Sequence, residues 1–554
     1  LSGRQVKFFI DGIPMDYFSS ALSINNLPIN LVERVEVYKG TVPVHLGADA
    51  LGGAVNIITR TDAPDFLDVS YSAGSFNTHR AAISMQKSLG QHFFVRGEAF
   101  YNYSDNNYWV DVEIPDELGN LDGTTNRVRR FHDAYRSAMV SVEGGVRNTR
   151  FADELSVRLI ASGNRNNVQH GISMNRVFGQ LFTTDEVLVP SVSYRKKNLF
   201  INGLELNTYT SFIEGHYQVA DTSSRTYDWL GNHTVKNNLA IGEARWEKTL
   251  FSFNDRTFLN QSNLQYQINQ QQHLNLNVVH SRFSRQGEDP LDPNIVPFSD
   301  PNYLNKTVAG MSYELKMLEE RLSATFFGKF YSYQAKAIEV DWDNTVNTAR
   351  LDFNKPGYGL AVSYFFRDLL QLKTSFERTW RLPDGFELFG DGLLTLNNAA
   401  LLPEESYNLN AGLLLHHVSD RHQITAETNF FYRDARNLIR IEASGITSQH
   451  VNLAEASSSG VEGDLTWRYS NWLTVGINAT YQNIINQTAY DEGRLSSVYQ
   501  DRIPNIPWFF ANLTAGLRKT AVWQEGDALN LQWYSRYVHD FYLNWPSQGD
   551  PDRK

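Results

Sequence analysis

The sequence predicts an all-β membrane protein in which a large antiparallel transmembrane β-barrel follows a small N-terminal domain. Two patterns lead to this prediction. Apolar and polar residues alternate from Asp65 onward, and short connections alternate with long ones along the same part of the chain. An alternating strand has one apolar and one polar face, which suits a barrel with lipid outside and water inside.

The composition of the 554 residues agrees with a barrel and excludes several other classes. Mean hydropathy is −0.40, and no run of about 18 apolar residues predicts a transmembrane helix. Aromatic residues make up 13% of the chain, which suits interfacial girdles but also a large soluble sugar-binding β-protein. The net charge of −11 argues against a nucleic-acid partner. The lack of cysteine excludes disulfides and cysteine-ligated metals.

The N-terminal 62 residues are predicted to form short strands separated by turns. Strands are expected at 6–10, 31–38 and 54–59, with a loop between the first two. Glycine adopts backbone angles that other residues resist, so bends are expected where glycines interrupt these strands. These glycines are Gly40, Gly47, Gly52 and Gly53.

Each strand of the predicted barrel carries its charges on one face. In the segment 93–103, Phe93, Val95 and Tyr101 share one face, and Arg96 and Glu98 lie on the other. The lipid-facing side needs to be uncharged, because a basic side chain at the middle of the bilayer costs roughly 2–4 kcal/mol. The pattern recurs at 155–162, 424–433 and 473–482.

Nineteen strands are expected, the last of them near 529–545. Barrels of this kind have short periplasmic turns and long outer loops, so we assign the long connections to the outside. The long connections are expected at 104–130, 163–197, 225–256, 286–303, 341–357, 383–405 and 484–506.

Three N-terminal motifs resemble the plug domain of TonB-dependent outer-membrane receptors. They are the turn at Ile10-Asp11-Gly12, the strand Val35–Gly40 and the segment Gly47–Thr59. The resemblance implies that residues 1–62 are the second half of a mixed α/β plug inside the lumen and that residues 63–554 form the barrel. The family closes its barrel with about 22 strands, so the resemblance implies a chain truncated at both ends, with the missing parts absent or in another chain. The plug residues implied to be structural are Asp11, Gly12, Gly40, Gly47, Gly52, Gly53 and Asn56.

Two segments of the barrel are similar to sequence boxes of the same family. One runs from Arg378 to Leu388, and the other from Asn398 to Glu404, where Ala399 replaces a proline. This replacement weakens a haem-specific interpretation, for which intact boxes are expected. The residues that carry the likeness are Arg381, Pro383, Glu387, Leu388, Pro403 and Glu404.

The resemblance implies active uptake of a scarce nutrient across the outer membrane of a Gram-negative bacterium. The implied partners are TonB, through a segment missing from this sequence, outer-membrane lipid, a small-molecule nutrient and a surface lipoprotein. A ferric siderophore is the favoured cargo, with haem, cobalamin and an oligosaccharide as alternatives. A soluble carbohydrate-binding protein or an adhesin is the alternative from another class.

No enzymatic site is recognisable in the sequence. The histidines lack partners at metal-ligand spacing, and there is no nucleophile elbow or phosphate-binding loop. We therefore expect no enzyme, no metal site and no cofactor other than a transported metal chelate. Acidic loop segments such as 288–292 leave calcium binding open, because their spacing is irregular.

Two sets of residues are candidates for function. Basic and aromatic side chains in the expected outer loops suit an anionic chelate, through charge and cation–π contacts. With two plug residues, these candidates are Tyr17, Phe18, Tyr108, Trp109, Arg127, Arg129 and Arg130. A second set is expected to form ion pairs between plug and barrel that hold the gate shut: Glu33, Arg34 and Glu36 with Arg433 and Glu462.

Overall fold

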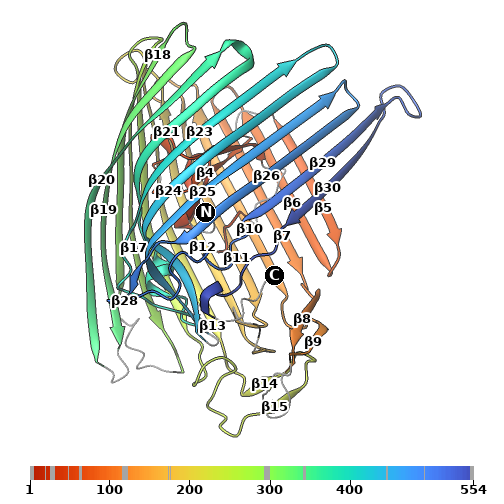
Figure 1. Cartoon of the computed structure of the whole chain (residues 1–554), viewed down its shortest axis with the longest axis vertical. Coiled ribbons are helices and arrows are strands. Elements are labelled where there is room, and N and C mark those ends of the chain that lie inside the picture. Colours follow the sequence, from red (N-terminus) through yellow and green to blue (C-terminus); the bar gives the residue numbers. More distant parts are fainter. Residues whose placement is uncertain are drawn as a thin grey trace.

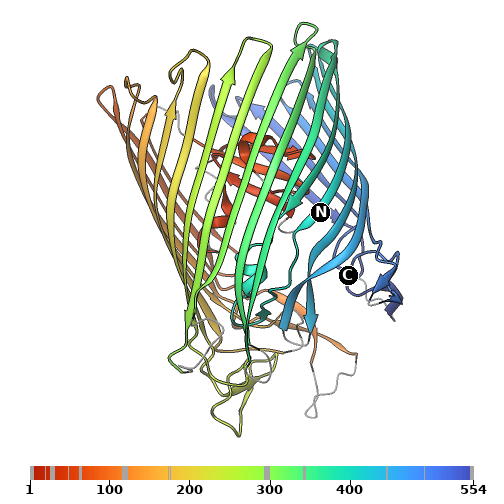
Figure 2. The same ribbon diagram turned by 90° about the vertical axis from the view of Figure 1, so that its left-hand side faces the viewer.

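The computed structural model shows a barrel that surrounds a small sheet (Figures 1 and 2). The residues it describes are 5–18, 20–24, 32–47, 49–60, 65–114, 123–171, 174, 176–291, 300–340, 345–444, 447–491 and 493–548. No helix among these residues is both long and apolar enough to cross a membrane.

The barrel sheet is closed, with its last strand next to its first. Within the described ranges it contains nineteen strands of nine or more residues and the two-residue strand β22 (Thr395–Leu396). The long strands are β5 (Phe66–Gly74), β6 (Thr78–Leu89), β7 (Phe93–Ser104), β10 (Tyr135–Arg147), β11 (Glu154–Asn167), β12 (Phe182–Lys196), β13 (Leu204–Ala220), β16 (Ser252–Gln267), β17 (Gln272–Glu288), β18 (Asn302–Met317), β19 (Leu322–Val340), β20 (Val346–Phe366), β21 (Leu370–Arg381), β23 (Glu404–Val418), β24 (His422–Ser444), β25 (Thr447–Tyr469), β26 (Leu473–Asn486), β29 (Phe509–Thr520) and β30 (Ala528–Val538).

The strand count agrees with the sequence, but three predicted bounds are wrong. The connection predicted at 163–197 contains the whole of β12. The last strand ends at Val538, before the predicted 545, and most of the long connection predicted at 341–357 belongs to β20. Along β20, Leu351 and Phe353 pack inward against a buried cluster, while Asp352 and Asn354 are exposed and hydrogen-bonded to each other at 2.6 Å. Such polar outward residues resemble a loop in sequence. That about three further strands belong to the barrel stays a prediction.

Apolar residues face outward and polar residues face inward along the barrel wall. On β10, Val140 and Val142 are 56% and 55% exposed, whereas Ser141 between them is 2% exposed. On the neighbouring β11, Leu159 is 50% exposed and Ser156 only 2%. A soluble sandwich would bury these valines and leucines, so the arrangement is that of a wall in contact with hydrocarbon.

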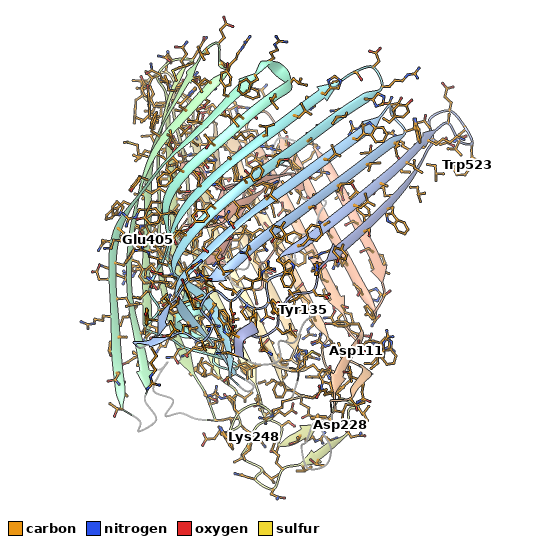
Figure 3. The ribbon with its side chains drawn as sticks, viewed as in Figure 1. Asp111, Tyr135, Asp228, Lys248, Glu405 and Trp523 are labelled. Atoms are coloured by element: carbon orange, nitrogen blue, oxygen red, sulfur yellow. The ribbon has the colours of Figure 1, made fainter. Side chains whose placement is uncertain are left out.

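The connections between strands sort to the two ends of the barrel. One end, which we call the loop end, carries Asp228 and Lys248, and the opposite end, the turn end, carries Trp523 (Figure 3). The small elements between long strands are β8 (Trp109–Glu113), β9 (Thr125–Arg129), β14 (Arg225–Tyr227), β15 (His233–Val235), η5 (Arg367–Leu369), α2 (Gly385–Phe389), β27 (Tyr490–Asp491), β28 (Arg494–Leu495) and, after β30, η6 (Pro546–Gln548).

The N-terminal sheet, which we call the plug, lies inside the barrel (Figure 2). Its strand order is β2-β1-β4-β3, with β1 and β4 parallel and the other pairs antiparallel. A small core centred on Phe9 and Leu46 holds it together. Its elements are β1 (Val6–Ile10), β2 (Ile13–Pro14), η2 (Met15–Tyr17), β3 (Val32–Lys39), η4 (Val44–Leu46) and β4 (Gly53–Thr59).

Candidate ligand-binding cavity and plug interface

A cavity of about 950 Å³ lies between the plug, the barrel wall and the segment around α2. Its plug side includes the predicted contact residues Tyr17 and Phe18, which follow β2. This volume is in the range of pockets that enclose a whole small-molecule ligand. Of the described residues that line it, several are aromatic: Phe8, Phe9, Tyr17, Phe18, Tyr103, Tyr135, Tyr217, Phe253, Phe283 and Phe386.

The carboxylates of the cavity wall are held by groups of the protein itself. Asp255 binds Arg285 through two hydrogen bonds of 2.8 and 2.7 Å. Asp185 accepts hydrogen bonds from Ser20 Oγ at 2.6 Å and from the backbone N–H of Ala21 at 3.2 Å. Asp391 accepts three backbone N–H groups of the chain that follows it. Aromatic rings, neutral amides and the exposed guanidinium of Arg80 therefore provide the wall that is left for a ligand. The amides include Asn102, Asn106, Asn164 and Asn166.

Four charged side chains meet at the floor of the cavity. Lys7 forms ion pairs with Asp16 and, at 3.4 Å, with Asp49, and Lys306 of β18 lies beside them. Burial alone would lower the pKa of Lys7, but the two carboxylates outweigh it and raise this pKa above its ordinary value. Burial opposes ionisation of Asp49 as well, yet Lys7 and Lys306 hold the pKa of this carboxyl below its usual range. Two basic and two acidic side chains therefore face one another at this point.

Barrel side chains hold the plug mainly through its backbone carbonyls. Six plug carbonyls accept hydrogen bonds of 2.5–3.3 Å from the wall. These bonds satisfy the main-chain acceptors of the plug. The pairs, donor first, are Gln261–Gly12, Ser162–Ala21, Asn277–His45, Thr379–Ala50, Asn408–Leu51 and Arg433–Gly52. Apolar contact with the wall is concentrated after β2, where Ala21 and Leu22 pack in a cluster of barrel side chains.

Two of the predicted structural glycines lie where the plug touches the wall. At Gly47, with φ +62°, a Cβ atom would lie 2.3 Å from Val279 Cγ2 and 2.4 Å from Asn277 Oδ1. At Gly40 it would lie 2.6 Å from Asn410 Nδ2. The glycines thus serve close approach to the barrel in addition to bending the chain.

The other predicted plug residues join β1 to β4. Asp11 accepts the backbone N–H and the hydroxyl of Thr59 at 2.8 and 2.6 Å. Asn56 accepts the N–H of Gly12 at 2.9 Å. Gly53 has φ +123° and would place a Cβ 2.4 Å from Tyr38 O, and the carbonyl of Gly52 is the acceptor of Arg433.

The predicted gate residues are arranged differently from the expectation. Arg34 pairs with Glu36 at 2.8 Å and Glu33 at 3.4 Å, both on its own strand, and in the described contacts no ion pair joins these three to the barrel. They lie on β3, an edge strand of the plug sheet, so their partners are local. The barrel residues of the predicted gate do reach the plug, since Glu462 lies 3.7 Å from Lys39 and Arg433 binds Gly52.

The predicted outer-loop residues form two clusters outside the described cavity lining. Trp109 carries Arg127 and Arg129 over its ring, at 5.8 and 5.7 Å. Arg130 contacts Tyr108 and His170 and forms an ion pair with Asp133 at 2.8 Å. Burial raises the pKa of Asp133 to about 6, against the opposing effect of Arg130.

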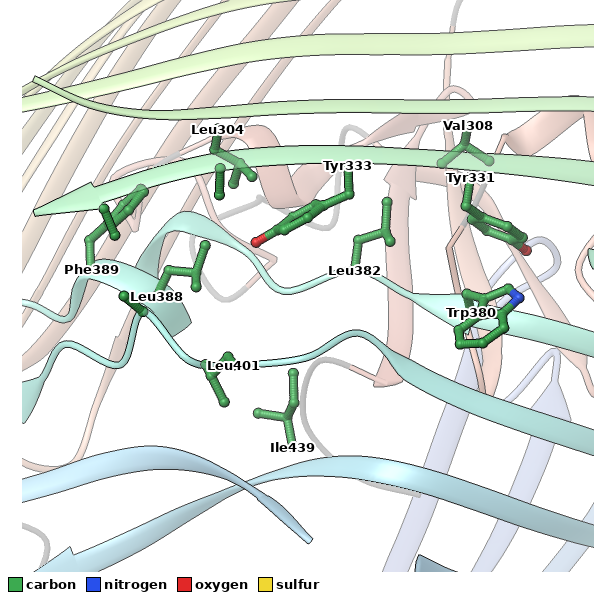
Figure 4. Packing of buried hydrophobic residues seen from close by; sticks show 13 residues of the cluster. Leu304, Val308, Tyr331, Tyr333, Trp380, Leu382, Leu388, Phe389, Leu401 and Ile439 are labelled. Atoms are coloured by element: carbon green, nitrogen blue, oxygen red, sulfur yellow. The ribbon is translucent and has the colours of Figure 1, made fainter. Parts of the chain in front are cut away.

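The residues of the barrel boxes build the segment that covers one side of the cavity. Arg381 is buried between Glu387 at 3.0 Å and Glu404 at 2.5 Å. The Asp384 side chain caps α2 by accepting the N–H of Glu387, and the Glu387 carboxylate accepts the N–H of Asp384 at 3.0 Å. Leu388 is fully buried in the cluster shown in Figure 4. Pro383 and Pro403 bracket this segment between β21 and β23.

Sequence reasoning missed Lys7, Asp49 and Lys306. Lys7 stands between Val6 and Phe8 in an apolar strand, and a lysine buried there needs an anionic partner. That signal was available, but nothing in the sequence shows which carboxylate pairs with it. No group of three or more histidine, aspartate or glutamate side chains suited to a metal ion occurs in the described ranges.

Comparison with known proteins identifies the family to which this barrel and plug belong. Residues 38–551 match the family model "TonB dependent receptor-like, beta-barrel", and residues 1–54 match the TonB-dependent receptor plug domain. The chain belongs to the TonB-dependent receptor family. It is therefore an outer-membrane protein, and the soluble and adhesin alternatives are wrong; members of this family are receptors and transporters, not enzymes.

The individual relatives are named for different transported ligands. The vitamin B12 transporter BtuB of Vibrio vulnificus (strain CMCP6) is 35% identical over 88 residues, which is 14% of this chain and 14% of that protein. The copper transporter OprC has a TM-score of 0.71 at 13% identity, with 96% of this chain and 77% of that one covered. A mutant of the ferric enterobactin receptor PfeA from Pseudomonas aeruginosa gives 0.70 at 16% identity, with 99% and 81% covered. At these identities the structures show a shared fold.

Proposed function

We propose that this receptor imports a large solute, most simply a ferric siderophore, which binds in the cavity between plug and loop end. The observation that carries the proposal is the position of the cavity, whose floor is the plug itself. A ligand seated there is separated from the turn end by the plug, so release requires movement of the plug. TonB is the proposed source of energy, and a surface lipoprotein remains a predicted partner.

The chemistry of the wall narrows the proposed cargo. Its carboxylates are bound by protein donors, and aromatic rings and asparagine side chains lie between them. Stacking and neutral hydrogen bonds, with Arg80 as an exposed cation of the lining, favour a neutral or weakly anionic chelate over a strongly anionic one. The same lining supports a second candidate, cobalamin or an uncharged oligosaccharide, whereas haem has no specific support.

Uptake by whole cells tests the transport proposal. The receptor is expressed from its complete gene in a Gram-negative host that lacks its own siderophore receptors, with TonB present or deleted. Radiolabelled iron is supplied as an uncharged trihydroxamate complex or as a trianionic tricatecholate complex. We expect TonB-dependent uptake that favours the uncharged complex. TonB-independent uptake would contradict the transport proposal, and uptake of cobalamin in place of both chelates would favour the second candidate.

A matched pair of variants tests the site. Asn164 lines the cavity and Val140 faces outward on the neighbouring strand. Asn164→Trp should abolish uptake by filling the cavity, whereas Val140→Trp should leave it unchanged. Equal uptake by the two variants would place the binding site elsewhere.

A further inference from the structure

The backbone N–H and carbonyl of Leu382 are both hydrogen-bonded to charged side chains. Its N–H donates to Asp49 Oδ2 of the plug at 3.1 Å. Its carbonyl accepts a hydrogen bond from Lys306 Nζ of the barrel wall, also at 3.1 Å. Both partners are charged, so both bonds are of the stronger, charge-assisted kind.

Leu382 is the first residue of the segment that covers the cavity. This segment, residues 382–403, begins directly after β21 and contains α2. Asp384, Gly385, Phe386 and Asp391 of this segment line the cavity. Pro383 has no N–H and fixes its own φ, so the hydrogen bonds of Leu382 determine how the segment leaves the barrel wall.

The side chain of Leu382 fixes the same point from within. It is fully buried and packs with Tyr333, Trp380 and Leu401 in the cluster of Figure 4. The next contacts outward are the ion pairs of Arg381 with Glu387 and Glu404, which tie the two ends of the segment together. Farther along, β22 pairs with β25, and Arg285 and Arg245 bind the carbonyls of Gly390 and Gly392. The part that can follow the plug is therefore the start of the segment, residues 382–389.

The plug side of this contact belongs to a short stretch, residues 49–52. Thr379 and Asn408 of the wall bind the carbonyls of Ala50 and Leu51, at 3.3 and 3.1 Å. Lys7 binds the other oxygen of Asp49 at 3.4 Å. The carboxylate thus links the plug strand β1 to the segment over the cavity, and the charge of Lys306 on the wall acts on it as well.

We propose that Asp49 is a positioning residue that couples the plug to the start of this segment, residues 382–389, through the N–H of Leu382. When stretch 49–52 moves away, this buried N–H loses its acceptor and Lys306 loses a neighbouring anion. An unpaired buried group is unfavourable, so the start of the segment shifts with the plug. Movement of the plug at the floor of the cavity therefore loosens one of its walls, which goes beyond the import proposed above.

Spin-label distances test the coupling without any ligand. The chain has no cysteine, so two introduced cysteines are the sole labelling sites. One pair, at Phe386 and Arg350, reports the start of the segment against the wall; Phe386 is half-buried and lines the cavity, and Arg350 is exposed. A second pair, at Val37 and Leu465, reports the plug against the wall.

We expect Asp49→Ala to broaden the first distance distribution at least twofold and to leave the second unchanged. Asp49→Asn should restore the narrow distribution, because its amide oxygen still accepts the Leu382 N–H. Lys39→Ala, which removes the plug–barrel ion pair with Glu462, is the control and should leave the first distribution unchanged.

Lys306→Met covers the case in which Asp49→Ala displaces the whole plug. It removes the other hydrogen bond of Leu382 from the barrel side and should broaden the first distribution as well. An unchanged first distribution in Lys306→Met, or in Asp49→Ala with the plug in place, overturns the proposal, and the Arg381 ion pairs and the bonds of residues 390–402 to the barrel then hold the segment. Equal broadening in Asp49→Asn and Asp49→Ala overturns it too. These outcomes are independent of whether the receptor transports a siderophore.

Discussion

The two sides of the plug are attached to the barrel in different ways. On the side of β1 and residues 45–52, charged and polar wall residues bind the plug at short distances, and glycines allow the backbone to touch the wall. On the side of β3, Val35 and Val37 are 54% and 59% exposed, and Arg34 binds only its own strand among the described ion pairs. Apart from the Lys39–Glu462 ion pair at the end of β3, these contacts hold the plug along one side. Substitutions on that side should therefore matter far more than those at Arg34, Val35 or Val37 of β3.

Removal of the Lys7 amine should have the largest effect. Lys7→Met leaves Asp16 and Asp49 without their buried cation, and breaking a buried pair costs about 3–5 kcal/mol. We expect this loss in the attachment of the plug, measured as the denaturant concentration at which a labelled plug leaves the barrel. A wild-type midpoint in Lys7→Met would remove the basis for one-sided anchoring.

Alanine at Gly47 should have the next largest effect. A left-handed non-glycine residue costs roughly 1–2 kcal/mol, and the overlap with Val279 and Asn277 adds about 1–3 kcal/mol. Gly12→Ala is a matched control, because Gly12 also has a positive φ but its Cβ would meet only Leu46 at 3.8 Å. The same denaturant assay should show a clearly larger fall of the midpoint for Gly47→Ala than for Gly12→Ala. Equal falls would mean that close approach to the wall is unimportant.

The stability of the cavity floor and that of the outer loops should depend on pH in opposite directions. The folded pKa of Asp49 is lowered, so its contribution is complete above the ordinary value of 3.8 and is lost as pH falls below it. Asp133 has the opposite sign: its pKa is raised to about 6, so its contribution is present below 3.8 and is lost as pH rises towards 6. Plug release and proteolysis of the loop, measured from pH 3 to pH 7, should therefore respond in opposite directions, and Asp133→Asn should abolish the second response.

Substitution of Arg34 should have the smallest effect. Arg34→Ala removes exposed ion pairs within β3, and solvent screens such pairs. We expect an unchanged midpoint of plug release and unchanged permeability to large antibiotics. A large change in either would restore Arg34 to the gate.

The fold could be predicted from local patterns, because apolar residues that face lipid alternate with polar residues that face the lumen within each barrel strand. The turn at Asp11 and Gly12 could also be predicted, and the structure brings it to Asn56. The partners across the plug–barrel interface could not. They depend on which of many wall positions faces the plug, and that is set by the closure of the whole sheet, so the sequence indicated charges on β3 and missed Lys306.

The outer loops show the same limit. Trp109 and its arginines satisfy one another on the hairpin β8–β9, although their composition suits an anionic ligand. Tyr17 and Phe18, in contrast, line the cavity because a short loop after β2 leaves them few other places. A residue close in sequence to a fixed element is easier to place than one in a long connection.

The carbonyl-based anchoring of the plug has a mechanical consequence. Water can replace each wall donor as soon as its hydrogen bond breaks, and no large apolar surface has to be wetted along residues 45–52. A force that pulls on the N-terminal side would therefore peel the anchored edge one bond at a time, at low load, and the same bonds could re-form when the force stops.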